Sequence, residues 1–474
     1  MTPSLASLAC VLFMGALFYI NYDRSARTSK ALWIPIVWLL IALSRAPAAW
    51  FKGPGDTMAG AGEEYIEGNP FERNIFSAII ALATVVLLMR GGRVGKFVRA
   101  NGPIVAFVLY CGLSLLWSDF PTIGFKRWTK LLGDLEMVLI VLTDREPAAA
   151  VDRVFTRVAF TLIPLSVLLN RYFPDLGRTY EPASGRMFFT GVTTNKNTFG
   201  MLCMIVGLYC WWRTLEEWQN RKARGRHGPL LANGFILLLS AYLLYVADSA
   251  TSKSCLYLCG GIIAVVKLFR FGRKPAVVHL LVAGAVGISV SALFFTGSLL
   301  GNLGRNSTLT GRTELWSEVL TIPVSRLVGA GYESFWLGDR LNMMWRLSGQ
   351  APVQAHDGYL EILVNLGWVG IIFLAALIIH GYCKIMQRLR RDPQRECLAL
   401  AFFVSALIYN LTEAAFKMSD PVWIFFVWAI MATKMRPLEV VAASSVKTST
   451  AASSPTSPTS LTSNGSIEES FHAI

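Results

Sequence analysis

About thirteen long runs of apolar residues follow one another along the chain, and they limit it to one broad class of fold. A soluble core does not need uninterrupted apolar stretches of this length, whereas a helix that crosses a bilayer does. The composition agrees, because 54% of the 474 residues are hydrophobic and only 16% are charged. We therefore predict an all-α polytopic integral membrane protein, with about 12–13 transmembrane helices and one large extracytoplasmic loop.

The first run, from Leu5 to Ile20, lacks a basic leader and a small-residue cleavage site, so we expect a retained span rather than a signal peptide. Residues 1–435 should form the transmembrane domain, which includes the large loop 298–357. Residues 436–474 are rich in Ser and Thr and should form a disordered cytoplasmic tail. The predicted spans are 5–21, 31–50, 73–90, 103–117, 127–143, 154–170, 197–213, 230–247, 254–270, 276–296, 358–381, 398–412 and 421–434.

Short basic clusters fall on alternate connections between these spans and predict the orientation of the chain. Lys and Arg are enriched in cytoplasmic loops, so the face that carries the clusters should be cytoplasmic. The net charge of +14 is divided among these short loops, which argues against nucleic acid as a partner. The clusters include Arg24, Arg27 and Lys30; Arg90, Arg93, Lys96 and Arg99; Arg221, Lys222, Arg224 and Arg226; Lys267, Arg270, Arg273 and Lys274; and Lys384, Arg388, Arg390, Arg391 and Arg395.

Other cations lie on the opposite side, against this topology rule. They point to a phosphate-bearing ligand, because the planar fork of Arg matches phosphate oxygens. The alternative is that long loops follow the charge rule poorly and that some of these arginines bind anionic headgroups. The outer cations are Lys126, Arg127 and Lys130; Arg171, Arg178, Arg186 and Lys196; Lys253; and Arg305, Arg312, Arg326, Arg340 and Arg346.

The long loop supplies two candidate site residues. Arg312 lies in Gly311-Arg-Thr-Glu-Leu-Trp316, which resembles the start of a helix. The backbone amides of such a helix start, together with the guanidinium, could bind an anion. His356 lies at the outer mouth of the next span and is the one histidine of five placed to serve outside chemistry. An imidazole titrates near neutral pH and can exchange protons there, although a histidine at such an interface can also be structural.

Four segments together resemble the O-antigen ligase and Wzy polymerase superfamily, and most of all its ExoQ-like exopolysaccharide polymerases. The similarity covers roughly residues 30–435. It departs from the family at position 253, where Lys replaces the usual Arg and loses the bidentate fork. The segments are Gly191-Val-Thr-Thr-Asn195-Lys196-Asn197-Thr-Phe-Gly200, Ser249-Ala-Thr-Ser-Lys253-Ser, Gly311-Arg312 followed by Trp316, and His356 followed by Gly367 and Gly370.

The resemblance implies a membrane glycosyltransferase of the C-type architecture in the bacterial inner membrane, with its active face in the periplasm. Its donor would be an oligosaccharide on undecaprenyl diphosphate, transferred with inversion, without a cofactor and without a metal. A chain-length regulator and a flippase of a polysaccharide assembly system are the expected partners. The eight cysteines offer no CxxC pair with partner histidines, so no zinc site is predicted.

The residues receive roles from this implied reaction. His356 is the predicted general base or acceptor-positioning group, and Arg312 and Arg186 are the first choices for stabilising the leaving diphosphate. Glu361 is predicted to orient His356, to bind sugar hydroxyls or to take part in helix packing. The predicted substrate-binding residues are Lys253, Lys196, Asn197, Lys126, Arg127, Lys130, Arg305 and Glu361.

Three alternatives stay open. A ligase would use the same chemistry with lipid A core or a protein as acceptor. A transporter or flippase of an anionic lipid-linked glycan would place charges at midmembrane on interrupted helices in two repeated halves, and the sequence shows few of these charges and no clear repeat. A structural scaffold for polysaccharide assembly is the third alternative.

Overall fold

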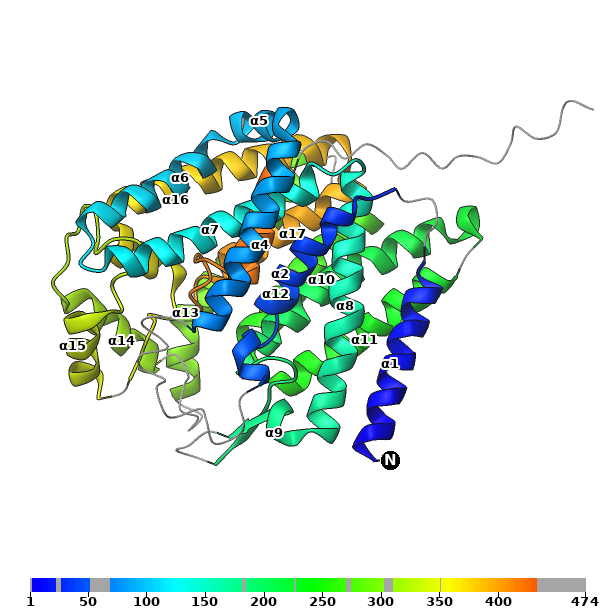
Figure 1. Cartoon of the computed structure of the whole chain (residues 1–474), viewed down its shortest axis with the longest axis horizontal. Helices are drawn as coiled ribbons and strands as arrows, with labels where there is room; N and C mark the ends of the chain where they lie inside the picture. The colour runs from blue at the N-terminus through cyan, green and yellow to red at the C-terminus, as the bar shows by residue number, and fades with distance from the viewer. Residues whose placement is uncertain are drawn as a thin grey trace, which may run out of the picture. The chain divides into compact units, whose positions relative to one another are not determined.

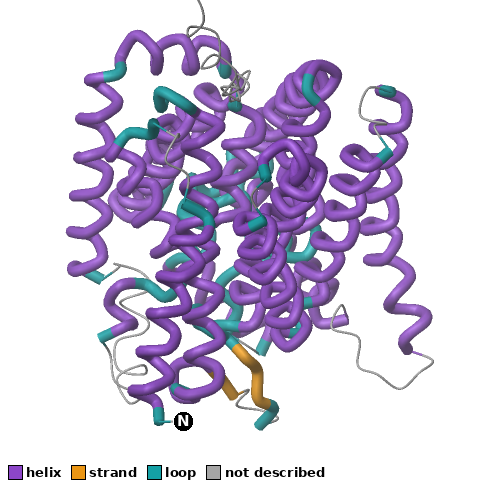
Figure 2. The backbone as a smooth tube through the Cα atoms, turned by 90° about the vertical axis from the view of Figure 1, so that its right-hand side faces the viewer, coloured by secondary structure: helices purple, strands orange, loops and turns teal. Residues whose placement is uncertain are grey.

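The chain folds almost entirely into helices in the computed structural model, which describes residues 2–22, 27–51, 69–180, 185–225, 227–269, 274–301, 310–349 and 351–432 (Figures 1 and 2). The strands β1 (Arg178–Tyr180) and β2 (Met187–Phe189) pair as a small antiparallel hairpin. The all-α polytopic class is therefore confirmed. The tail predicted at 436–474 lies outside the described residues.

The elements follow the apolar runs closely, and each predicted span falls on a helix. Short 3-10 turns at Lys30–Leu32, Pro47–Trp50 and Ser114–Trp117 extend some of them. The helices are α1 (Pro3–Ile20), α2 (Trp33–Ala42), α4 (Pro70–Met89), α5 (Gly91–Ala100), α6 (Gly102–Leu113), α7 (Pro121–Leu142), α8 (Pro147–Tyr172), α9 (Pro174–Gly177), α10 (Lys196–Arg224), α11 (Gly228–Ala247), α12 (Ala250–Leu268), α13 (Pro275–Gly301), α14 (Thr310–Thr321), α15 (Gly338–Ser348), α16 (Gly358–Arg391), α17 (Pro393–Tyr409) and α18 (Pro421–Met431).

Within the described ranges, seven helices are long and apolar enough to cross a membrane: α1, α4, α10, α11, α12, α13 and α16. The pair α5 and α6, bent by 90°, would raise the number to eight. This is fewer than the 12–13 predicted, because some of the other runs form shorter helices, such as α2 with 10 residues. Others, such as α7, carry charged side chains among their apolar ones.

Apolar surface on the outer helices explains why the protein needs a membrane. Within an 18-residue apolar stretch of each helix, only 11% of α1 and 17% each of α4 and of α13 (275–293) are buried within the protein, against 72% of α10. Side chains such as Leu12, Leu88 and Ile372 are well exposed. Apolar surface of this extent is unfavourable in water and favourable in lipid. The protein is thus a multi-pass membrane protein with α10 in its interior.

Helix α16 is interrupted at Gly367, where a neighbouring loop enters it. Gly367 has φ 66° and ψ −167°, which is not helical. The backbone N–H groups of Trp368 and Val369 donate to the carbonyls of Arg326 and Leu327, at 3.0 and 3.1 Å. At the break, backbone N–H groups of the helix therefore donate hydrogen bonds to a segment that is distant in the sequence.

The inserted loop (residues 326–331) also donates back to the helix. The N–H groups of Ala330 and Gly331 donate to the carbonyls of Val364 and Asn365, at 3.0 and 2.8 Å. Backbone groups freed by a helix break must find such partners inside a membrane protein, because hydrocarbon offers none. The loop and the first turns of α16 consequently form one hydrogen-bonded unit.

Helices α10, α12 and α16 begin, and α17 ends, at one end of the bundle, which we call the loop end. The N–H of Gly358, at the start of α16, donates to the carbonyl of Asn410 at 2.8 Å, just after α17. Thr251, in the first turn of α12, is hydrogen-bonded to Thr412 with 2.6 Å between the hydroxyl oxygens. Four segments that are distant in the sequence thus meet at the loop end.

Substitution of Gly367 by Ala should destabilise this end of the protein. A Cβ at position 367 would lie 2.2 Å from the carbonyl oxygen of Leu327, and the backbone conformation alone costs other residues about 1–3 kcal/mol. We expect a lower Tm in lipid nanodiscs and faster proteolysis of the inserted loop. The matched variant Gly284→Ala, which meets nothing within 4 Å, should keep the wild-type Tm. Equal Tm values for both variants would contradict the role given to Gly367.

Candidate active site at the loop end

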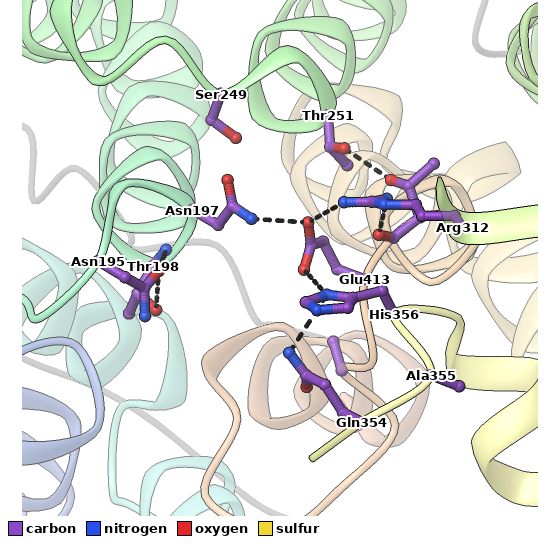
Figure 3. Close-up of polar contacts among 12 residues, drawn as sticks. Asn195, Asn197, Thr198, Ser249, Thr251, Arg312, Gln354, Ala355, His356 and Glu413 are labelled. Carbon is purple, nitrogen blue, oxygen red and sulfur yellow. Dashed lines mark hydrogen bonds and ion pairs between the residues drawn. The ribbon is translucent and has the colours of Figure 1, made fainter. Parts of the chain in front are cut away.

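His356 lies at the end of the long loop, one residue before the N-cap of α16, and it faces Glu413 (Figure 3). Its Nδ1 is 3.2 Å from Oε2 of Glu413. A carboxylate only accepts hydrogen bonds, so in the neutral imidazole this contact places the hydrogen on Nδ1 and leaves Nε2 with a lone pair. The His356 side chain is 35% exposed and that of Glu413 only 10%. The imidazole is therefore anchored on one nitrogen and able to take a proton on the other.

Arg312, on α14, binds the other oxygen of the same carboxylate. Its Nη2 lies 3.0 Å from Oε1 of Glu413, and its Nη1 donates to the carbonyl of Thr412. Asn197, in the first turn of α10, also donates from Nδ2 to Oε1 at 2.9 Å. Glu413 thus accepts hydrogen bonds from three separate segments, which fix its carboxylate between His356 and Arg312 (Figure 3).

A second polar side chain approaches His356 from the opposite direction. Nε2 of Gln354 lies 3.3 Å from Nδ1 of His356, and the amide oxygen of Gln354 accepts from Nζ of Lys417 at 3.1 Å. Nδ1 cannot donate to Glu413 and accept from Gln354 at the same time. The bond to a charged carboxylate is the stronger of the two, so Glu413 determines the tautomer.

Glu361 holds the backbone that leads to His356. Its Oε1 accepts from the N–H of Ala355 at 2.6 Å, and both of its oxygens lie 2.9 Å from Nε1 of Trp336. Trp316, on α14, donates to the carbonyl of Ala355 at 2.9 Å. The structure thus directs the Glu361 carboxylate to donors of the protein, which favours a positioning role over the predicted contact with sugar hydroxyls.

Three cations gather around the carboxylate of Asp248, in the turn between α11 and α12. Nη2 of Arg186 lies 3.2 Å from Oδ2, and Nζ of Lys253 lies 2.9 Å from Oδ1. The hydrogen bond from Lys253 and the charges of Lys253, Arg186 and Lys196 lower the pKa of Asp248. We call these four residues the Asp248 cluster. It is open to solvent, since the Arg186 and Asp248 side chains are 64% and 52% exposed.

The Glu413 contacts and the Asp248 cluster share two helices. Lys196 and Asn197 are consecutive at the start of α10. On α12, Thr251 contacts Thr412 whereas Lys253 contacts Asp248. The structure therefore brings five of the predicted residues to the loop end, in addition to His356. They are Arg312, Arg186, Lys253, Lys196 and Asn197.

The predicted cations of α7 take other partners. Arg127, next to Lys126 on the first turns of the helix, donates to the carbonyl of Glu333. Nζ of Lys130 lies 4.6 Å from the ring centre of Phe76. These contacts join α7 to the long loop and to α4 rather than to Glu413.

Two further predictions concern Arg305 and metal binding. Arg305 lies outside the described residues. Among the residues that are described, no group of three or more His, Cys, Asp or Glu side chains is placed to hold a metal ion.

Sequence reasoning missed the carboxylate at the centre of the site. Glu413 follows the predicted span 398–412, in a connection that carries no recognisable motif. The available signal was its position, because an acidic residue at the outer end of a late span lies on the same side as His356. Asp248 carried the same signal in the turn before Lys253.

Comparison with known proteins shows what the chain is similar to. Residues 235–375 match a family model described as O-antigen ligase. Three of the four predicted motif segments fall inside this range, and the segment Gly191–Gly200 precedes it. The chain is also 28% identical over 323 residues to the exopolysaccharide production protein ExoQ of Rhizobium meliloti (strain 1021), covering 65% of this chain and 70% of that protein.

These two matches confirm the resemblance predicted from the sequence. The chain is similar to O-antigen ligase over residues 235–375 and to the exopolysaccharide production protein ExoQ over 65% of its length.

Proposed function

We propose that the protein is a glycosyltransferase of the bacterial inner membrane that polymerises exopolysaccharide repeat units on the periplasmic side. Its donor would be a glycan linked to undecaprenyl diphosphate. The similarity to ExoQ supports this assignment. The observation that carries it is the His356–Glu413 contact, which leaves a basic nitrogen at the loop end with cations nearby.

The proposed reaction uses Nε2 of His356 as the general base. It takes the proton of an acceptor sugar hydroxyl while the hydroxyl oxygen forms a bond to the anomeric carbon of the donor. The bond from that carbon to the lipid diphosphate breaks, and its electron pair leaves with the diphosphate. Attack from the face opposite the leaving group inverts the anomeric configuration. Glu413 stabilises the imidazolium that forms, as a carboxylate partner of a catalytic histidine does.

Arg312 and the Asp248 cluster supply the positive charge that the leaving diphosphate requires. Each of the two terminal nitrogens of Arg312 donates one hydrogen bond within the protein, Nη1 to Thr412 and Nη2 to Glu413. A guanidinium has five N–H donors, so others remain for phosphate oxygens. Cations held in place before the reaction stabilise charge that develops in the transition state more than they stabilise the ground state.

Ligation of a finished glycan to another acceptor is the second candidate function. The family model that matches residues 235–375 carries the description of an O-antigen ligase. The chemistry at His356 and Arg312 would be the same, and only the acceptor would differ.

His356→Ala and Arg312→Ala should each lower the transfer rate. Loss of the base is expected to cost about 100- to 10,000-fold, and loss of the cation about 100-fold or more. The measurement is the elongation of lipid-linked repeat units by purified protein in nanodiscs, followed on gels. His279→Ala is a suitable control, because His279 is bonded to Tyr382 on another part of the bundle. Wild-type rates in both variants would refute the mechanism.

Glu413→Gln should lower kcat with a small effect on KM. The amide keeps the size of the side chain but cannot stabilise the imidazolium by charge, so the loss appears in the transition state. We expect a decrease in kcat of about 10- to 10,000-fold. The control Glu314→Gln changes an exposed carboxylate on α14 and should leave both constants unchanged. A variant that raised KM alone would assign Glu413 to substrate binding instead.

Deletion of the gene should separate the two candidate functions. A strain that lacks the polymerase is expected to accumulate single lipid-linked repeat units, because each unit still reaches the membrane but is not elongated. A strain that lacks a ligase should accumulate long lipid-linked chains. Mass spectrometry of extracted glycolipids makes the distinction, and long chains would contradict polymerisation.

A further inference from the structure

Asp248 occupies the centre of a group of cations that the proposed reaction needs for a phosphate. One of its oxygens contacts Arg186 and the other contacts Lys253. Its two oxygens therefore hold two cations as the oxygens of a diphosphate would. We propose that Asp248 is a resident counter-ion, which the diphosphate of the lipid-linked donor displaces from Arg186 and Lys253 when it binds. This inference rests on the function proposed above.

The charge balance of the cluster favours an anionic ligand. Arg186, Lys196 and Lys253 carry three positive charges and Asp248 one negative charge, which leaves a surplus of +2. Phe188 holds two of the cations close together, with its ring centre 5.1 Å from Arg186 Cζ and 4.2 Å from Lys196 Nζ. Like charges gathered on one ring repel each other, and a ligand with about two negative charges relieves that repulsion.

The position of Asp248 is set by the backbone, which makes the role of its charge testable. Asp248 ends α11 in the left-handed conformation, with φ 53° and ψ 40°. Asn and Gly adopt this conformation readily. Asp248→Asn and Asp248→Gly should therefore keep the helix end and change only the carboxylate.

Displacement is feasible because neither ion pair is buried. The side chains of Asp248 and Arg186 are 52% and 64% exposed, and that of Lys253 is 24% exposed. Solvent-exposed ion pairs of this kind shift an equilibrium by only about two- to five-fold. A diphosphate offers more oxygens than a carboxylate, so it can replace Asp248 without breaking a buried network.

The experiment measures the binding of inorganic pyrophosphate to the full chain in nanodiscs of neutral lipid, by isothermal titration calorimetry at constant ionic strength. Asp248→Asn and Asp248→Gly should each lower the Kd about two- to five-fold, because the competing carboxylate is gone. Lys253→Met should raise it. In the transfer assay, Asp248→Asn should lower the KM for the lipid-linked donor.

Asp119→Asn is the matched control. It removes the same charge from another exposed ion pair at the same side of the chain, where Asp119 lies 2.6 Å from Arg340. Its Kd for pyrophosphate should equal that of the wild type. Tighter binding by Asp119→Asn and unchanged binding by Asp248→Asn would place the anion at Arg340 and overturn the proposal.

Weaker, unchanged or undetectable binding by Asp248→Asn would likewise overturn it, because the carboxylate would then support the cations or be irrelevant to them. Failure of the proposed function can be distinguished from failure of this proposal. Pyrophosphate binding needs no glycosyl transfer, so the expected Kd changes combined with full activity of His356→Ala would leave the anion site standing and refute the mechanism.

Discussion

The arrangement of the loop end depends on the hydrogen bonds that the Glu413 carboxylate accepts. It is nearly buried, and a buried charge is costly unless cationic or polar groups surround it. Arg312, Asn197 and His356 meet that requirement from α14, α10 and the end of the long loop. Satisfying one desolvated charge thus brings three distant segments to a common point. The same requirement determines which nitrogen of His356 carries hydrogen.

Glu413 and Asp248 are both anionic side chains at the loop end, but they differ in burial, and this difference suggests different roles. Glu413 is 10% exposed and accepts hydrogen bonds from donors of the protein. Asp248 is 52% exposed and lies among cations that other anions can reach. A fixed carboxylate suits the orientation of a base, whereas an exposed one suits exchange with a ligand. The lower pKa of Asp248 keeps it ionised and able to act as a counter-ion.

Much of the helical architecture follows from the sequence, because an apolar run of span length has few alternatives in lipid. His356 and Arg312 were also predictable, since each lies in a local motif at a span or helix boundary. Glu413 was not, because its significance comes from contacts with side chains 57 and 101 residues away in the sequence. Glu361 was predictable as a residue of interest, whereas its bond to the backbone of Ala355 required the structure. Local patterns thus give the elements and candidate residues, and tertiary contacts decide which candidates meet.

The break at Gly367 has a consequence for how the chain is assembled. The inserted loop precedes α16 in the chain. Its backbone groups therefore have no partners in α16 until that helix has been synthesised. The N–H groups of Trp368 and Val369, at the start of the second half of α16, have the loop carbonyls of Arg326 and Leu327 as their partners. Without those partners, such groups would be unfavourable in hydrocarbon. Assembly of this region therefore requires that the loop, which precedes α16 in the chain, pack against the helix after the helix has been made.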